Sequence, residues 1–550
     1  MSELAEPIGI KASQEGLLNR LASIQVRVSW EVAAYAALMI AAAGMRFWDL
    51  GSRSLNHDEG IHGLYAWRLF SGMGYEHFPL VHGPFQFFGT AFSFFLFGGA
   101  GDYTLRILPA IFGSALVALP FFLRHRLGTV GALLAAAAIA FSPTLLFFSR
   151  FARNDIYVAF FTLGLVVCLW RYIDERKHGY LYLGALLLGL SFATKENTFI
   201  NVAVLVAFLN LWLAVHFWRQ LDKGANLSLL TSFLALVFLL PFAWAVAALW
   251  PFSRGLRERV GLEEWHPAAD FLIVLGTLSL PQFAAAIQVP LEALLGIDEG
   301  DLAAVVWSDA SFGPFDLGTV TRENLLGSST IVALIAATAV IGLRWNPRAW
   351  LLVAAAFYIP YVLLFTSFFT NVDGFYSGNW NSLDYWLDQQ DVRRGNQPWF
   401  YYLMLLPSYE FLPLLFAAPA LFYHAVTGDI FRRFLVFWVV ATLFGYSMAG
   451  EKMPWNSVHT SLPVIILAAC FLAGLFARLP VRGIASWPAS HLLPLLAGAL
   501  GLAAVGLGVF GPEGGPWFPL RILVVFAAVV GTLYLLLPLA VQRAATVIVS

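Results

Sequence analysis

The chain has 550 residues, of which 59% are hydrophobic and only 12% are charged, whereas about a quarter of a soluble domain is charged. This composition excludes an ordinary soluble protein, and the net charge of −1 offers nothing to attract a nucleic acid. The two cysteines, Cys168 and Cys470, both lie in apolar runs, which argues against a disulfide framework or a cysteine-based metal site.

Apolar runs of membrane-crossing length recur along the sequence and predict an all-α polytopic membrane protein with about 14 transmembrane helices. We place the spans at residues 30–47, 103–123, 129–148, 156–173, 180–197, 199–217, 226–250, 329–344, 349–369, 408–426, 432–449, 456–477, 490–510 and 518–541. Short loops rich in Lys and Arg lie between alternate spans and are expected in the cytoplasm, together with both termini. Residues 1–29 fit either a cytoplasmic interfacial helix or a frayed tail.

Two further apolar stretches do not fit as crossings. Residues 84–98 are too short and follow a His-Gly-Pro break. Residues 271–296 contain two prolines, and a crossing there would make the number of crossings odd and put the two termini on opposite sides of the membrane. We expect both to be re-entrant or interfacial. The basic segment 254–259 is anomalous for an outer loop, which weakens the interpretation of 271–296.

The predicted organisation has four parts. It comprises the tail at 1–29, a transmembrane core at 30–369 with an acidic first outer loop at 48–102, an aromatic outer loop at 370–406, and C-terminal helices at 407–550. Chemistry is therefore expected on the outer loops and at the outer ends of the spans.

The first outer loop carries the tripeptide His57-Asp58-Glu59. Adjacent carboxylates at a membrane surface suit proton abstraction or metal binding, but acidic residues are also favoured at any helix N-terminus. With His62, His77 and His82 in the same loop, a divalent Mg, Mn or Zn site is conceivable, the candidate ligands being His57, Asp58, Glu59 and His82. The spacing matches no metal motif, so interfacial histidines without a metal are the preferred interpretation.

Ionisable residues cluster at the predicted outer ends of the spans, where burial is costly and function is the default explanation. They are Arg106, Arg150, Arg153, Asp155, Lys195, Glu196, Glu451 and Lys452. Arg and Lys there suit the phosphate of a lipid headgroup. The alternative is a set of ion pairs that only cap helix ends.

The outer loop at 370–406 is rich in aromatic side chains interleaved with Asn, Asp, Gln and Arg. Trp and Tyr at such a position commonly form an interfacial belt. Stacking of Trp380, Trp399 and Tyr401 on a sugar or an isoprenoid is the functional alternative.

The order of these elements resembles the GT-C superfamily of membrane glycosyltransferases, in particular the protein O-mannosyltransferases. The likeness rests on the acidic pair Asp58-Glu59, on Arg106 at the start of the second span, and on the turn from Ser149 to Asp155. The stretches SRFARNDIYVAFFTLG, SFATKEN, RGNQPWFYY and GEKMPW are similar to a flippase-activity-associated subfamily of archaea and bacteria.

The resemblance implies transfer of a hexose or pentose from a polyprenyl-phosphate donor to a hydroxyl of a protein, lipid or glycan at the outer face of the plasma membrane. Asp58 would be the base, and Glu59 would orient the acceptor or bind a metal. The donor phosphate would meet Arg150, Arg153, Lys195 and Lys452, supported by Arg106, Asp155, Glu196, Glu451 and Trp455. Acceptor or sugar contacts would come from Trp380, Trp399 and Tyr401. The alternatives are a non-catalytic flippase or flippase accessory for lipid-linked sugars, and a structural subunit of a membrane complex.

Overall fold

A computed structural model describes residues 30–225, 228–287, 294, 296, 322–372, 374–392 and 394–478. Contacts divide the chain into two units, Met1–Gly474 and Leu475–Ser550, and the fold is described within the first. The predicted tail at 1–29 and the predicted spans at 490–510 and 518–541 lie outside the described residues.

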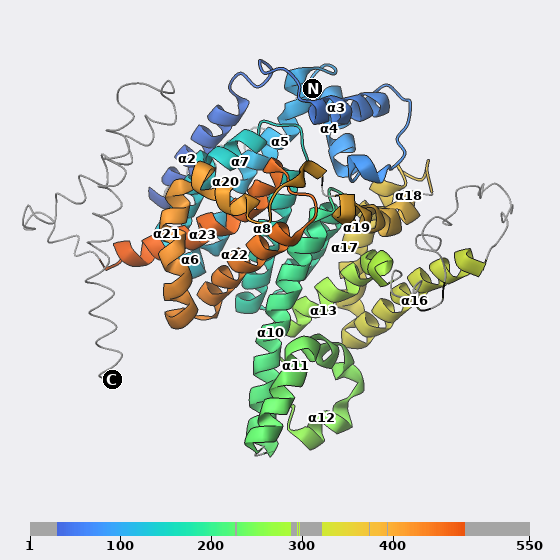
Figure 1. Ribbon diagram of the computed structural model, residues 1–550, viewed down its shortest axis with the longest axis vertical. Coiled ribbons are helices and arrows are strands. Elements are labelled where there is room, and N and C mark those ends of the chain that lie inside the picture. The colour runs from blue at the N-terminus through green and yellow to red at the C-terminus, as the bar shows by residue number, and fades with distance from the viewer. Residues whose placement is uncertain are drawn as a thin grey trace, which may run out of the picture. The chain divides into compact units, whose positions relative to one another are not determined.

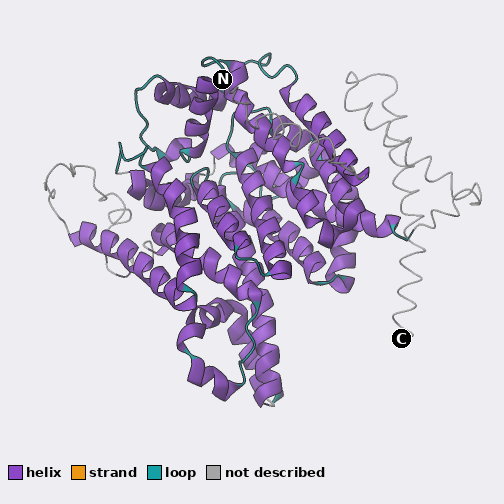
Figure 2. Ribbon diagram, turned by 180° about the vertical axis from the view of Figure 1, so that it is seen from behind, coloured by secondary structure: helices purple, strands orange, loops and turns teal. Residues whose placement is uncertain are grey.

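The described residues are helical without a β-strand, as the sequence predicts (Figure 2). The longer helices are α2 (Trp30–Phe47), α3 (His57–Phe70), α4 (Phe85–Leu96), α5 (Asp102–Leu116), α6 (Arg124–Phe141), α8 (Asp155–Glu175), α9 (Gly179–Phe192), α10 (Asn197–Ala225), α11 (Leu229–Leu249), α13 (Pro267–Ser279), α16 (Arg322–Trp345), α17 (Pro347–Phe365), α19 (Ser382–Val392), α21 (Phe411–Thr427), α22 (Ile430–Met448) and α23 (Ser457–Phe476). Short helices at the site are α7 (Pro143–Phe148) and α20 (Tyr401–Tyr409).

Eight helices among the described residues are long and apolar enough to cross a membrane, and a ninth is obtained if α20 and α21, bent by 118°, form one span. The count of about 14 stays a prediction. The stretch at 84–98 forms only the 12-residue α4, in agreement with the expectation that it does not cross. The helices run between two ends, which we name by their charges. The site end carries Asp58, Arg153 and Lys195, and the basic end carries Arg126 and Lys223.

The core of the bundle is α8, which packs against α5, α9, α10 and α13. It begins at the site end with buried Asp155 and ends at the basic end, where Arg176 adopts a left-handed conformation and terminates the helix. Most of its side chains are fully buried, as expected of a helix that is apolar on all sides. This central helix fixes the depth of the charged residue at its first position.

The predicted span at 226–250 does not run from one end to the other. Its helix α11 starts beside α10 at the basic end, where the indole of Trp218 donates to Ser232 over 2.8 Å. The 3₁₀ turn η3 (Trp250–Phe252) after α11 returns to the same level, because Trp250 stacks on Phe217 with ring centroids 5.6 Å apart. Figure 1 shows α11 and the short α12 (Arg254–Val260) beside the lower half of α10.

A proline and an asparagine explain the bend in α11. Pro241 lies inside the helix and cannot donate a backbone hydrogen bond. The side chain of Asn210 donates to the Leu240 carbonyl over 2.5 Å and accepts from the Trp244 amide over 2.7 Å. One side-chain amide thus satisfies both backbone groups that the bend exposes, as buried polar groups require.

The structure differs from the sequence-based expectations for two segments, 226–250 and 271–296. α11 is long and apolar enough to span, but its contacts return it to the basic end, so 226–250 was wrongly predicted to cross. The described part of 271–296 lies in a 21-residue helical segment, Pro267–Ile287, which passes the same test of length and composition. It starts beside Tyr172, whose hydroxyl donates to Asp270 over 2.7 Å, and ends beside Phe199, which packs on Phe283 at the site end. The arginines at 254–259 therefore belong to the basic end.

Candidate functional site

The acidic pair is positioned by the start of α3. Asn56 caps the helix by accepting from the Asp58 amide over 3.2 Å, while Glu59 accepts from the Asn56 amide over 3.2 Å. This reciprocal capping box places consecutive carboxylates on different sides of the helix. Asp58 and Glu59 therefore have different partners.

Glu59 is fully buried and its two oxygens are saturated. Arg106, also fully buried, donates from Nε and Nη2 over 2.8 Å each, and the Ala152 amide donates over 2.9 Å. Arg53 adds a contact of 3.1 Å. Burial raises the pKa of Glu59, but these hydrogen bonds outweigh it and hold the pKa below its usual range. Glu59 is thus an anion that ties α3, α5 and the loop before α8 together.

Asp58 has the more accessible carboxylate and forms an ion pair with Arg153. The guanidinium of Arg153 is buried, lies 3.4 Å from the ring centre of Trp455, and reaches Asp155 over 3.4 Å. Burial lowers the pKa of Arg153, while Asp155, Asp58 and the nearby Glu451 oppose that effect. A cation is therefore held between two carboxylates on an aromatic face.

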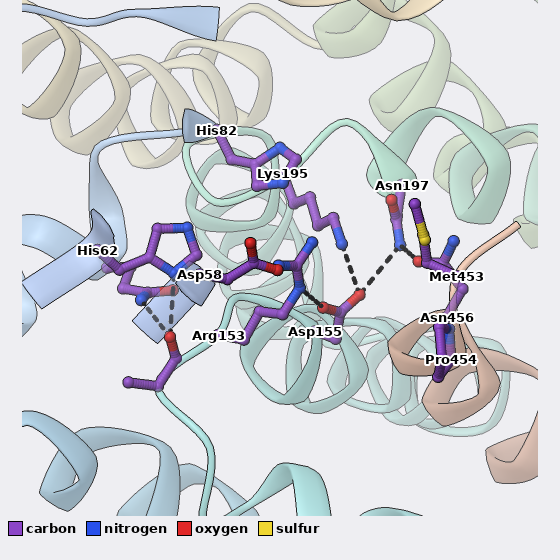
Figure 3. A network of polar contacts seen from close by, with 12 residues as sticks. Asp58, His62, His82, Arg153, Asp155, Lys195, Asn197, Met453, Pro454 and Asn456 are labelled. Atoms are coloured by element: carbon purple, nitrogen blue, oxygen red, sulfur yellow. Dashed lines mark hydrogen bonds and ion pairs between the residues drawn. The ribbon is translucent and has the colours of Figure 1, made fainter. Parts of the chain in front are cut away.

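Asp155 is the buried hub of this network (Figure 3). Its Oδ1 accepts from Lys195 over 2.8 Å and from Asn197 over 3.3 Å, and it lies 3.3 Å from His459 Nε2. Burial lowers the pKa of Lys195, with Arg153 adding to the effect and Asp155 opposing it. The hub joins the first turn of α8, the loop before α10 and the start of α23, which are far apart in the sequence.

Asn197 and His459 were not among the residues predicted from the sequence. Asn197 continues the network to the Asn456 side chain over 3.0 Å. His459 stacks face to face on Tyr446, with ring centroids 5.3 Å apart. A signal existed in both cases, because Asn197 ends the charged stretch SFATKEN and His459 is a polar residue inside an apolar run.

Arg150 and Lys452 contact backbone carbonyls at helix ends. Arg150 donates to the Met45 carbonyl over 2.8 Å and to the Asp49 carbonyl over 3.3 Å, where the side chain caps the C-terminal end of α2. Lys452 donates to the Ala449 carbonyl over 2.8 Å at the end of α22. Both interactions complement the negative end of a helix dipole. These two cations thus stabilise the ends of α2 and α22.

The histidines of the first outer loop have separate partners. His62 Nδ1 lies 3.0 Å from the Ala152 carbonyl, His77 Nδ1 lies 2.6 Å from Ser377 Oγ, and His82 Nδ1 lies 2.7 Å from Glu196. In the described part of the chain, no three His, Cys, Asp or Glu side chains form a group that would hold a metal ion. As placed, His57, Asp58, Glu59 and His82 do not fit a Mg, Mn or Zn site.

The aromatic outer loop contacts the site through polar interactions. Besides Ser377 on His77, the Gln390 side chain accepts from the Gly450 amide over 2.5 Å, and the Tyr402 hydroxyl donates to the Met453 carbonyl over 3.2 Å. These contacts bring the loop against both the first outer loop and the segment that carries Trp455.

The three aromatic candidates in that loop differ in exposure. Trp380 lies in a π-helical turn, η5 (Ser377–Asn381), and is fully buried, whereas Trp399 is 60% exposed. Tyr401 is partly buried and packs on Tyr402, with ring centroids 5.3 Å apart. Trp455 therefore contacts the charged network directly, whereas the ring of Trp399 is exposed on the surface.

Residues 58–253 match the family model for dolichyl-phosphate-mannose-protein mannosyltransferases. The matched segment covers well under half of the 550 residues but includes Asp58, Arg106, Arg153, Asp155 and Lys195. This supports the expected relation to the GT-C superfamily of membrane glycosyltransferases and does not bear on the flippase-activity-associated subfamily. No curated protein matches the chain.

Three solved structures show a distant likeness. The archaeal oligosaccharyltransferase AglB from Archaeoglobus fulgidus, in complex with an inhibitory peptide and a dolichol-phosphate, is 15% identical, with 92% of this chain and 55% of that chain covered and a TM-score of 0.44. ArnT from Cupriavidus metallidurans bound to undecaprenyl phosphate is 16% identical, with 94% and 71% covered and a TM-score of 0.41. The S. cerevisiae protein O-mannosyltransferase Pmt1–Pmt2 complex is 20% identical, with 48% and 38% covered and a TM-score of 0.30. The chain thus spans about half the length of AglB.

Proposed function

We propose that this protein is a membrane glycosyltransferase that moves a sugar from a polyprenyl-phosphate donor to an acceptor hydroxyl. The observation that carries the proposal is the network of Asp58, Arg153, Asp155 and Lys195, in which a carboxylate stands beside two buried cations at one end of the bundle. The family match over the same residues supports it. The sugar is a hexose or a pentose, and the acceptor is a protein, lipid or glycan.

Asp58 is proposed as the general base. Its carboxylate takes the proton of the acceptor hydroxyl, the hydroxyl oxygen forms a bond to the anomeric carbon, and the bond from that carbon to the donor phosphate breaks with inversion. The electron pair leaves with the phosphate, whose charge increases. Fixed positive charge at that position stabilises the transition state. Arg153 and Lys195 supply it, since both are already held near Asp58 and Asp155.

The remaining candidates have supporting parts in this proposal. Glu59 and Arg106 fix the start of α3 and so aim Asp58, while Arg150 and Lys452 hold the ends of α2 and α22 beside the donor phosphate. Residues 370–406 cover the acceptor side, with Trp380 as a packed support and Trp399 and Tyr401 as contacts for the sugar or acceptor.

We place the site end outside the plasma membrane and the basic end in the cytoplasm, because cytoplasmic loops carry an excess of Lys and Arg. Both termini then lie in the cytoplasm. The core at 30–369 forms the site together with residues 451–459 of the C-terminal region at 407–550. The donor tail is undecaprenyl in a bacterium or dolichyl in an archaeon, and we group the chain with the flippase-activity-associated proteins.

The test is transfer by the purified protein in lipid nanodiscs with a panel of undecaprenyl- and dolichyl-phosphate sugars and with peptide, lipid and glycan acceptors. Asp58→Asn keeps the shape but not the base, so turnover should fall about 10²–10⁴-fold while donor binding stays near wild type. Lys195→Ala should weaken donor binding as well. Asp102→Asn is the matched control, because this exposed carboxylate at the site end lies outside the network.

Full-rate transfer by Asp58→Asn would reject the base assignment. Donor binding without transfer, together with rescue of a deletion strain by Asp58→Asn, would instead favour a flippase or flippase accessory, which needs the headgroup site but no base.

A further inference from the structure

Three buried side chains hold the backbone of Ala152, the residue directly before Arg153. The Ala152 amide donates to Glu59 over 2.9 Å. The Ala152 carbonyl oxygen accepts from His62 Nδ1 and from Gln86 Nε2, both over 3.0 Å, since a carbonyl oxygen can only accept. Glu59, His62 and Gln86 are all buried. We call these three side chains the Ala152 clamp.

The backbone inside the clamp makes a tight turn. The Arg153 amide donates to the Phe151 carbonyl over 2.7 Å, so the chain turns within three residues centred on Ala152. The Ala152 methyl group packs against buried apolar side chains from α3, α4 and α5, namely Ala66, Phe94 and Leu105. The amide, the carbonyl and the side chain of Ala152 are thus all fixed before the chain reaches Arg153.

The clamp determines where the side chain of Arg153 starts, and that side chain lies at the centre of the charged network. Its guanidinium pairs with Asp58 and reaches Asp155 over 3.4 Å. His62 lies four residues after Asp58, on the same face of α3. One helix face therefore carries both the proposed base and a donor that holds the peptide before the cation. Figure 3 shows Asp58, His62 and Arg153 in one part of the site.

We propose that His62 and Gln86 are positioning residues for the binding of the donor phosphate. By holding the Ala152 carbonyl, they keep the Arg153 guanidinium at a fixed distance from Asp58, so that the cation meets the phosphate while the carboxylate meets the acceptor hydroxyl. A displacement of about 1 Å at such a group can cost a large part of its effect. This inference rests on the proposed function, because it takes Arg153 as a phosphate-binding group.

His62 and Gln86 test this effect more cleanly than Glu59 does. Glu59 also binds Arg106 and Arg53, so its loss disturbs the start of α3 as well. Gln86 lies on α4 and can be changed without altering α3. Because two donors from two helices meet on one carbonyl oxygen, the same contact can be weakened from either side.

The test is a double-mutant cycle on the affinity for undecaprenyl phosphate and dolichyl phosphate, measured on the protein in lipid nanodiscs. Arg153→Gln should weaken binding about 10- to 100-fold, as expected for a hydrogen bond to a charged group. His62→Leu and Gln86→Leu each remove one neutral donor and should weaken binding about 3- to 10-fold. Added to Arg153→Gln, either change should cause no further loss, because the cation that it positions is gone.

Two further variants separate positioning from a purely structural role. His62→Asn should restore most of the affinity, because its amide nitrogen can take the place of Nδ1. Ser93→Ala is the matched control, since Ser93 is buried on α4 and donates to the Thr104 carbonyl over 2.7 Å. This change also removes a buried hydrogen bond from α4, so it should lower the melting temperature as Gln86→Leu does but leave the affinity at the wild-type value.

Wild-type affinity in one of the two leucine variants would remove that residue from the proposal, and wild-type affinity in both would overturn it. An equal loss in the wild-type and Arg153→Gln backgrounds would also overturn it. In these cases sugar transfer by the wild type would leave the proposed function standing. If His62→Leu does not fold, the cycle with Gln86→Leu decides.

The proposed function fails in a different way. A cycle that behaves as expected in a protein that transfers no sugar would support the positioning of Arg153 but count against the transferase. A wild type that binds neither lipid phosphate would overturn both.

Discussion

Replacing Glu59 by glutamine should destabilise the protein far more than the same change at Asp58. The amide keeps the shape and can still accept from Arg106 Nε and from the Ala152 amide. Its NH₂ group, however, then faces three donors that Oε2 satisfied, namely Arg106 Nη2, Arg53 and the Asn56 amide. Breaking a buried ion pair by removing one partner costs about 3–5 kcal/mol.

Asp58→Asn is the matched comparison. The Asp58 side chain is 26% exposed, and Arg153 keeps Asp155 as a counter-charge after the change. The expected cost is about 1 kcal/mol, the typical worth of one hydrogen bond. The two variants should therefore differ in what they impair: Glu59→Gln should lower mainly the melting temperature, and Asp58→Asn should lower mainly the turnover.

The assay is thermal unfolding of the purified protein in one detergent, followed by tryptophan fluorescence. Glu59→Gln should lower the melting temperature by on the order of 5 °C or more, and Asp58→Asn by much less. Adding Arg106→Gln to Glu59→Gln should cost less than the sum of the two single changes, because each single change leaves an unpaired buried group. Equal melting temperatures for Glu59→Gln and Asp58→Asn would refute this reasoning.

Three further outcomes are expected. The pKa of Glu59 in the folded protein is lowered from the ordinary 4.5. The ionised carboxylate therefore stabilises the fold above about pH 4.5, and this contribution is lost as the pH falls through the folded-state pKa. The difference in melting temperature between wild type and Glu59→Gln should accordingly shrink in acid. A membrane-impermeant thiol reagent should label Lys223→Cys and Gly255→Cys from the same side of the membrane and Asp102→Cys from the other side. If Gly255→Cys is instead labelled from the same side as Asp102→Cys, α11 crosses the membrane. Gly83→Ala should cost about 1–3 kcal/mol and weaken transfer, since a β-carbon there would lie 2.3 Å from a backbone carbonyl oxygen; melting and transfer equal to wild type would contradict the tight packing.

The sequence predicted the central part of the candidate site because each of its residues lies at the start of a helix or in the turn between two helices. Asp58, Arg153, Asp155 and Lys195 follow or begin apolar runs, and antiparallel spans bring alternate ends to one face. Sequence pattern does not specify where a side chain in a short turn points. Arg150 and Arg153 lie three residues apart, yet one contacts the end of α2 and the other contacts Asp58.

The same limit explains the error at 226–250. Hydropathy measures composition, and α11 has the composition of a spanning helix. Its bend depends on Asn210, which lies 31 positions before Pro241 and whose role appears only when α10 and α11 pack together. The arginines after α11 were a signal in the sequence, because they conflict with an outer location, and Pro241 inside the apolar run was another.

The hairpin of α11 also has a consequence for biosynthesis. While the chain is being made, α11 emerges as an apolar segment that the insertion machinery would accept as a crossing helix. Arg254, Arg257 and Arg259 emerge next and oppose translocation of the adjoining segment. The Asn210 clamp can form only once α10 is in place, so α10 acts as a template on which α11 folds back. The orientation of every later helix, including the one that carries His459, then depends on this early step.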